Sequence, residues 1–232
     1  MDSLHNTSIE LNNRAATLIQ NNSYVAAISS LTTALQSTQQ RFESFDTVNP
    51  PMQGLSLNEC MTSARSDEMT TPDANRQTSK QMYQRPIHIP KCWRQSESHE
   101  SNLIISAVIM FNLGLSHHLE AVETQRKCKT SITSLLSKAA KLYELAYNMV
   151  MESHSETSNL IFVMTVVNNL GMVYEMLQDD ETAEEYFKHL LSMLMVVVDC
   201  GEGDVVSKFG NGLLFRTTSH LISKTGTTAG AA

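Results

Sequence analysis

Three asparagines are the side chains of this 232-residue chain best suited to a chemical role. Asn13, Asn112 and Asn169 occupy the same position in three similar apolar segments. An asparagine amide donates and accepts hydrogen bonds at once. A row of amides can therefore pair with both the N–H and the C=O groups of an extended peptide without reading its side chains. The row predicts a peptide-binding site. The alternative is that these amides are solvated or hydrogen-bond between neighbouring repeats.

Catalytic and metal-binding patterns are missing from the sequence. The adjacent His117 and His118 lie about 100° apart on a helix, so both cannot easily ligate one metal ion. The four cysteines are far apart in the sequence and form no CxxC pair. Neither an HExxH motif, a glycine-rich phosphate loop nor a nucleophile elbow is present. We therefore expect no enzymatic activity, no cofactor and no metal site.

The segment around Asn169 has the periodicity of a helix pair. Val167, Leu170, Gly171 and Tyr174 fall on one face of a helix. After a turn at Gln178-Asp179-Asp180, a second helix presents Ala183 and, four residues on, Phe187. The small residues Gly171 and Ala183 allow the two helices to approach closely, while Tyr174 and Phe187 fill the space beside them. This stretch predicts two antiparallel helices.

Two further segments fit the same template. The second has Met110, Leu113, Gly114, Ala139, Tyr143 and Ala146, and the first has Leu11, Ala15, Leu18, Tyr24, Ala27, Leu31 and Ala34. This layout resembles the tetratricopeptide (TPR) repeat, with Leu190 and Met195 as departures from it. The helix order is also similar to that of lineage-expanded TPR-like families of unicellular algae. The resemblance implies an all-α fold, a TPR-like α-solenoid of antiparallel helix pairs, each burying its apolar face against its neighbours.

The resemblance also implies a concave groove lined by the first helix of each pair. Ten residues would line this groove: Asn13, Phe111, Asn112, Leu115, His118, Thr165, Asn169, Met172, Glu175 and Met176. The alternative for the methionines is a place in the core. The TPR clamp that grips acidic chaperone tails needs lysine and arginine, but the matching positions hold Asn12, Ala16, Thr165 and Asn169. A neutral, apolar or basic partner is therefore expected rather than an acidic one.

Composition changes along the chain predict four regions. Residues 1–44 form the first helix pair, and 45–99 form a disordered insertion that contains all five prolines. Residues 100–200 form the second and third pairs, with helices near 100–122, 130–152, 157–178 and 180–199. A capping helix near 203–223 and a flexible tail occupy 201–232. Within the insertion, the alternating residues 85–93 predict a short extended piece, docked on the helices or acting as a linear motif.

The charge balance limits the classes of partner. A net charge of −7 argues against nucleic acids and anionic membranes. The apolar runs are shorter than the about 18 residues that cross a bilayer. The polar N-terminus is unlike a targeting peptide, so a cytoplasmic location is expected, with the nucleus as an alternative. Homo-oligomerisation stays open.

The function expected from these features is that of an adaptor or scaffold. Its groove, centred on Asn112 and Asn169, binds a peptide segment of another protein. As exposed polar groups, these two asparagines should each contribute little to stability, under ~1 kcal/mol for the pair. The alternative is a self-associating structural protein whose groove is filled by its own insertion or C-terminal helix.

Overall fold

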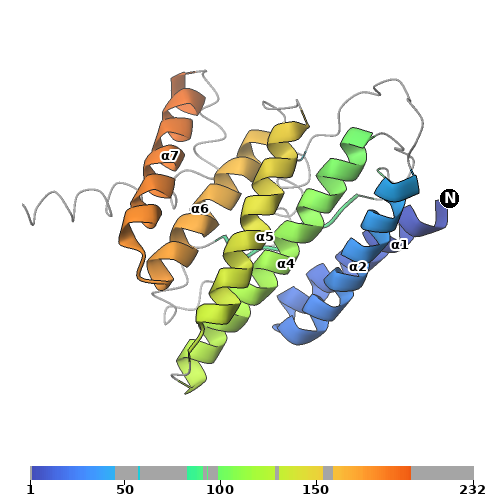
Figure 1. The fold of residues 1–232 in the computed structure, drawn as a ribbon, viewed down its shortest axis with the longest axis horizontal. Helices are drawn as coiled ribbons and strands as arrows, with labels where there is room; N and C mark the ends of the chain where they lie inside the picture. Colours follow the sequence, from blue (N-terminus) through green and yellow to red (C-terminus); the bar gives the residue numbers. More distant parts are fainter. Residues whose placement is uncertain are drawn as a thin grey trace, which may run out of the picture. The chain divides into compact units, whose positions relative to one another are not determined.

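The computed structural model describes residues 2–44, 57, 83–90, 93, 99–128, 131–153 and 159–199. These residues contain six α-helices (Figure 1). They are α1 (Asp2–Gln20), α2 (Tyr24–Ser44), α4 (His99–Cys128), α5 (Thr133–Glu152), α6 (Leu160–Met176) and α7 (Asp180–Asp199). The prediction of an all-α protein with helices in sequential pairs is confirmed. The predicted capping helix near 203–223 lies outside the described residues.

The chain divides into two compact units. Unit 1 comprises Met1–Glu68 and Gln84–Val166, and unit 2 comprises Met69–Tyr83 and Val167–Ala232. The division falls within α6, so the first seven residues of this helix belong to unit 1 and the rest to unit 2. Each unit is described by itself below.

In unit 1, helices adjacent in the chain pack on each other, α1 with α2 and α4 with α5, and α2 also packs on α4. Every residue from 101 to 116 of α4 is buried, which explains why this helix is apolar around most of its circumference. The Phe111 ring of α4 lies 5.6 Å from Tyr143 and 5.5 Å from Phe162. These aromatic contacts connect α4 to α5 and to the start of α6.

Glycine on α4 allows α5 to approach. A Cβ atom added at Gly114 would lie 3.1 Å from the Tyr143 ring and 3.4 Å from the Ala139 carbonyl oxygen. In unit 2, a Cβ added at Gly171 on α6 would lie only 2.7 Å from the Phe187 ring on α7. The predicted close approach at Gly171 is therefore present, and the equivalent glycine of the preceding pair faces the equivalent aromatic residue.

The turns within the first and last pairs share one geometry. Asn22 and Gln178 both have positive φ angles, of 56° and 64°. At the end of α1, the Asn22 N–H donates to Ile19 O and the Ser23 N–H donates to Leu18 O. At the end of α6, Gln178 and Asp179 donate in the same pattern to Glu175 O and Tyr174 O. Both are Schellman motifs, which satisfy carbonyls that a helix end leaves unpaired.

This shared geometry aligns the sequences of the first and last helix pairs without a gap. Asn22 and Gln178 are 156 residues apart, and so are Asn13 and Asn169. The same offset relates Ala15 to Gly171, Ala27 to Ala183 and Leu31 to Phe187, all of them buried. Asp179 directly precedes α7 and caps it, because its carboxylate accepts hydrogen bonds from the N–H and the hydroxyl of Thr182.

One helix among the described residues, His99–Lys127, is long and apolar enough to cross a membrane by length and composition alone. Its most apolar stretch is 89% buried within the protein. Core helices of globular proteins pass the same test, so the finding is weak evidence for a membrane span.

Candidate functional site

A short extended segment of the chain, residues 83–90, is held by the predicted asparagines. We call it the resident segment. Asn112 pairs with both backbone groups of one of its residues. The Ile87 N–H donates to Asn112 Oδ1 at 2.9 Å, and Asn112 Nδ2 donates to the Ile87 carbonyl at 2.8 Å. In Figure 1 the segment is the thin green trace beside α4. The Asn112 amide therefore binds the segment through the backbone of Ile87 and not through its side chain.

Asn13 repeats this arrangement two residues further along the segment. The Ile89 N–H donates to Asn13 Oδ1 at 2.7 Å, and Asn13 Nδ2 donates to the Ile89 carbonyl at 2.8 Å. Asn13 lies on α1 and Asn112 on α4, so two helices that are distant in the sequence hold neighbouring residues of one extended segment. The resident segment thus connects α1 to α4 within unit 1.

Asn12 connects the side-chain amides of Asn13 and Asn112. Its Nδ2 donates to Ile87 O at 3.1 Å and to Asn13 Oδ1 at 3.2 Å, and its Oδ1 accepts from Asn112 Nδ2 at 2.9 Å. Both amide hydrogens of Asn12 and of Asn112 are used. Turning any of these amides over would oppose donor to donor, so the network fixes the orientation of each one.

In unit 2, Asn169 holds another residue of the segment. The Tyr83 N–H donates to Asn169 Oδ1 at 3.0 Å, and Asn169 Nδ2 donates to Tyr83 O at 3.1 Å. The neighbouring Asn168 donates to Asn169 Oδ1 at 3.3 Å, as Asn12 does to Asn13 in unit 1. Each of the three predicted asparagines therefore hydrogen-bonds to both backbone groups of one residue. Asn112 binds Ile87, Asn13 binds Ile89 and Asn169 binds Tyr83.

Apolar burial accompanies the backbone contacts in unit 1. Ile87 and Ile89 have 0% and 1% of their surface exposed. Trp93 is also buried, and its N–H donates to Pro90 O. Leu57, from the same stretch of sequence, is fully buried, and its N–H donates to Asn159 Oδ1. The extended piece predicted near 85–93 is therefore docked on the helices at 83–90. Of the predicted insertion, Leu57, residues 83–90, Trp93 and His99 are described, and its other residues lie outside the described part of the chain.

The other predicted groove residues of unit 1 are all buried. Phe111, Leu115 and His118 have no exposed surface, and Thr165 has 1%. Phe111 packs in the aromatic cluster between helices, and the Thr165 hydroxyl donates to Ile161 O within its own helix. In unit 2, Met172 is buried, whereas Glu175 and Met176 are partly exposed. Burial of this kind fits a core role for most of these side chains, and their part in ligand binding stays a prediction.

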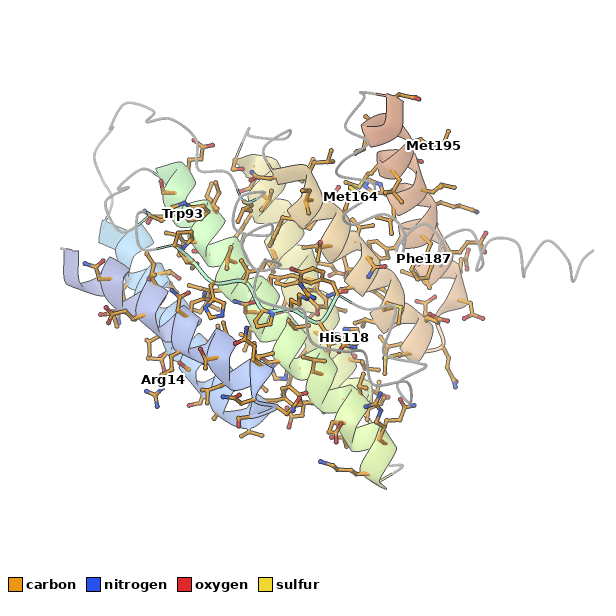
Figure 2. All side chains as sticks on the ribbon, turned by 180° about the vertical axis from the view of Figure 1, so that it is seen from behind. Arg14, Trp93, His118, Met164, Phe187 and Met195 are labelled. Carbon is orange, nitrogen blue, oxygen red and sulfur yellow. The ribbon has the colours of Figure 1, made fainter. Side chains whose placement is uncertain are left out.

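His118 on α4, labelled in Figure 2, is a fully buried histidine. Its ring lies edge-on to Tyr143, with centroids 6.2 Å apart. Neither ring nitrogen has a hydrogen-bond partner among the described residues. Burial lowers the pKa of His118 to about 3, so the ring is neutral near pH 7. The neighbouring His117 is less buried, and both burial and the charge of Lys138 lower its pKa.

Two features of the site differ from the expectation of an open groove. Asn112 and Asn169 are both fully buried rather than exposed, because the resident segment covers them. The sequence reading also left Asn12, Ile87 and Ile89 out of the site. The sequence patterns that mark these residues are the Asn-Asn pairs at 12–13 and 168–169 and the Pro-Ile-His-Ile-Pro run at 86–90.

The comparisons with known proteins add no identification. No protein-family model matches the sequence, and no curated protein or solved structure matches it significantly. Among residues 2–44, 57, 83–90, 93, 99–128, 131–153 and 159–199, no group of three or more histidine, cysteine, aspartate or glutamate side chains could hold a metal ion.

Proposed function

We propose that the chain is a TPR-like adaptor that binds an extended peptide through the backbone, and that residues 83–90 are its resident ligand. The observation that carries the proposal is the pair of hydrogen bonds between the Asn112 amide and both backbone groups of Ile87. Buried backbone groups need partners in any fold, and here one side-chain type supplies both partners of a residue at three positions. The same pairing recurs at Asn13 and, in unit 2, at Asn169.

The helix pairs support the TPR-like part of the proposal. Gly114 faces Tyr143 in one pair and Gly171 faces Phe187 in the next, as in a repeat that matches a small residue with a large one. Asn13 and Asn169 each precede a Schellman turn, at Asn22 and Gln178, by the same number of residues, which supports equivalent positions for them in two repeats. Repeats of this kind are stable only when stacked, and they offer side chains at regular intervals to an extended ligand.

The chemistry of the site supports a partner without strong negative charge. The three reading residues are neutral amides, and each uses its donor and acceptor on the backbone. A protein partner of neutral, apolar or basic sequence fits this site, and nucleic acids and membranes do not. A cytoplasmic location, or a nuclear one, is part of the same proposal.

The second candidate function is a structural protein whose groove is filled permanently. The burial of Ile87, Ile89, Leu57 and Trp93 favours it, because each of these side chains contributes to the core of unit 1. Fully burying such a side chain stabilises a protein by about 1.5–3 kcal/mol, so the segment is a substantial part of the fold. The two candidates differ in whether the groove accepts a peptide in trans.

The test uses a full-length variant that cannot dock its own segment. In this open variant, Ile87→Asp and Ile89→Asp place two carboxylates where apolar side chains are buried. The probe is a fluorescent peptide with residues 83–93 and Cys92→Ser. Saturable binding to the open variant is expected, with loss of binding after a further Asn112→Ala change. Asn148→Ala, at an exposed asparagine on α5, is the matched control and should leave binding unchanged.

Loss of helical structure in the open variant is also informative. A groove that accepts peptides should then refold when the peptide is added, which circular dichroism would detect. A folded variant that binds no peptide, or an unfolded one that the peptide does not restore, would support the structural candidate instead.

A further inference from the structure

In unit 1, asparagines hydrogen-bond to the backbone of every second residue of the resident segment. Ile87 and Ile89 each use both backbone groups on asparagines, and both side chains are buried. Between them, the side chain of His88 is partly exposed, and no hydrogen bond of its backbone to a described residue is seen. In an extended chain the N–H and C=O of one residue point to one side, and those of the next residue point to the other. The groove therefore binds the backbone and buries the side chain of alternate residues.

Proline occupies the unread positions on either side. Pro86 precedes Ile87, and Pro90 follows Ile89. Proline has no N–H, so it could not replace either isoleucine, but at 86 and 90 no N–H is needed. Proline also restricts the residue before it to extended conformations, here Arg85 and Ile89. This restriction lowers the entropy lost when the segment docks.

The edge of the segment that carries Pro86, His88 and Pro90 is unsuited to further strand pairing. A strand edge normally offers N–H groups to another strand, and proline removes them. Pro86 is buried and Pro90 is partly exposed, and His88 is the residue between them on this edge that retains an N–H. The segment is therefore suited to a groove that hydrogen-bonds to one of its edges. It is not suited to the addition of further strands at the other edge.

We propose that the groove selects segments of other proteins by this alternation. The ligand class is an extended peptide with two aliphatic residues two positions apart, the first preceded and the second followed by proline. Residues 83–90 compete with such a ligand in cis and so limit access to the groove. This inference rests on the proposed function, because it names the ligand of the same asparagine row.

Mass action favours another protein over a second copy of this chain. Eight residues, 91–98, separate the segment from α4, so the cis segment has an effective concentration of about millimolar or more. The same segment from a second copy makes the same contacts and has no advantage over the cis segment. A different protein can displace the cis segment by binding more tightly, or it can bind after the segment has been released.

The experiment compares three peptides that carry residues 83–93 with Cys92→Ser and differ in one N-methyl group. The methyl group blocks the N–H of Ile87, of Ile89 or of His88. Their affinities for the open variant are measured by competition with the unmethylated fluorescent peptide. We expect methylation at Ile87 or Ile89 to weaken binding about tenfold, the effect of one lost buried hydrogen bond. Methylation at His88 should change affinity less than about twofold, because this N–H is unread.

Three further measurements test the rest of the proposal. Replacing Ile87 or Ile89 in the peptide by aspartate should abolish binding. The wild-type chain should bind the unmethylated peptide at least about tenfold more weakly than the open variant, because its groove is occupied. Light scattering should show the same oligomeric state for the wild type and the open variant. No dimer should depend on Ile87 and Ile89.

The outcomes separate the two proposals. If no peptide binds the open variant, the proposed function fails. If the unmethylated peptide binds but the three methylated peptides are equally weak or equally strong, the groove binds peptides and the alternation rule is wrong. Equal affinity of wild type and open variant would refute competition in cis. A dimer that depends on Ile87 and Ile89 would identify a second copy as the ligand.

Discussion

Asn112 holds both backbone groups of Ile87, at 2.9 Å for the N–H and 2.8 Å for the carbonyl. The two residues are 25 positions apart in the sequence, and both are fully buried. The contact ties an extended segment to α4, in which every residue from 101 to 116 is buried. Its strength therefore affects both the stability of the fold and access to the proposed groove.

Replacing Asn112 by alanine should reduce the free energy of unfolding by about 2–3 kcal/mol. The change removes three hydrogen bonds and leaves the Ile87 N–H and Asn12 Oδ1 buried without these partners. Asn148→Ala on the exposed face of α5 should stay within about 0.5 kcal/mol of wild type. Urea unfolding of both variants measures the difference. Equal stabilities would mean that Asn112 is solvated and the segment undocked.

Alanine at Gly171 should destabilise the protein, whereas alanine at Gly114 should be nearly neutral. The new Cβ lies 2.7 Å from Phe187 in the first case and 3.1 Å from Tyr143 in the second. Overpacking costs about 1–3 kcal/mol, and alanine recovers about 1 kcal/mol of helix propensity. Thermal unfolding checks the order of the two variants.

A double-mutant cycle isolates the contact at Gly171. Phe187→Leu removes ring atoms that the new methyl group meets, so it should cost less in the Gly171→Ala background than in wild type. Additive effects would indicate that Gly171 and Phe187 do not touch in solution.

The two helix turns have residues that are not optimal for their backbone. Glycine adopts positive φ more readily than any other residue, and asparagine tolerates it better than glutamine does. Gln178→Gly should therefore stabilise the protein by about 0.5–1 kcal/mol, and Asn22→Gly by less. As a control, Lys141→Gly on the exposed face of α5 should cost about 1 kcal/mol. Destabilisation by Gln178→Gly would contradict the turn geometry.

His118 should make stability depend on pH in the acidic range. Its folded-state pKa, about 3, lies below the ordinary value of 6.5, so the unfolded chain binds a proton that the folded chain excludes. The contribution of His118 is fully present above pH 6.5 and is lost as pH falls toward 3, with a slope of about 1.4 kcal/mol per unit.

His118→Leu tests this dependence. The variant should be at least as stable as wild type at pH 7, because it replaces a buried ring that has no hydrogen-bond partner among the described residues by an apolar side chain. Its advantage should grow between pH 6 and pH 4, as measured by urea unfolding at each pH. A constant difference would show that the imidazole is solvated.

Helix positions could be predicted from the sequence because their information is local. The spacing of Leu170, Gly171 and Tyr174 indicates one helix face, and the turn at Gln178-Asp179 indicates where the next helix begins. The observed α6 and α7 fall within three residues of the predicted ranges. The capping of α7 by Asp179 is equally local, because its carboxylate accepts a hydrogen bond from the N–H of Thr182 three residues on.

The occupant of the asparagine row was harder to predict because its contacts are not local. Ile87 and Ile89 lie 75 and 76 positions from Asn12 and Asn13. The sequence indicated that the amides suit an extended backbone and that 85–93 suits an extended piece. No periodicity connects the asparagine row with the extended piece. Because the amides contact the backbone of the segment and not its side chains, neither sequence pattern indicates the other as its partner.

Hydrogen exchange at the amides of residues 87, 88 and 89 tests the central claim most directly. In the wild-type chain, NMR should show slow exchange at Ile87 and Ile89 and fast exchange at His88, because only the first two N–H groups are held by asparagines. Asn112→Ala should accelerate exchange at Ile87 more than at Ile89, and Asn13→Ala should do the reverse. Equal and fast exchange at all three amides of the wild-type chain would contradict the docking of the resident segment on the asparagine row.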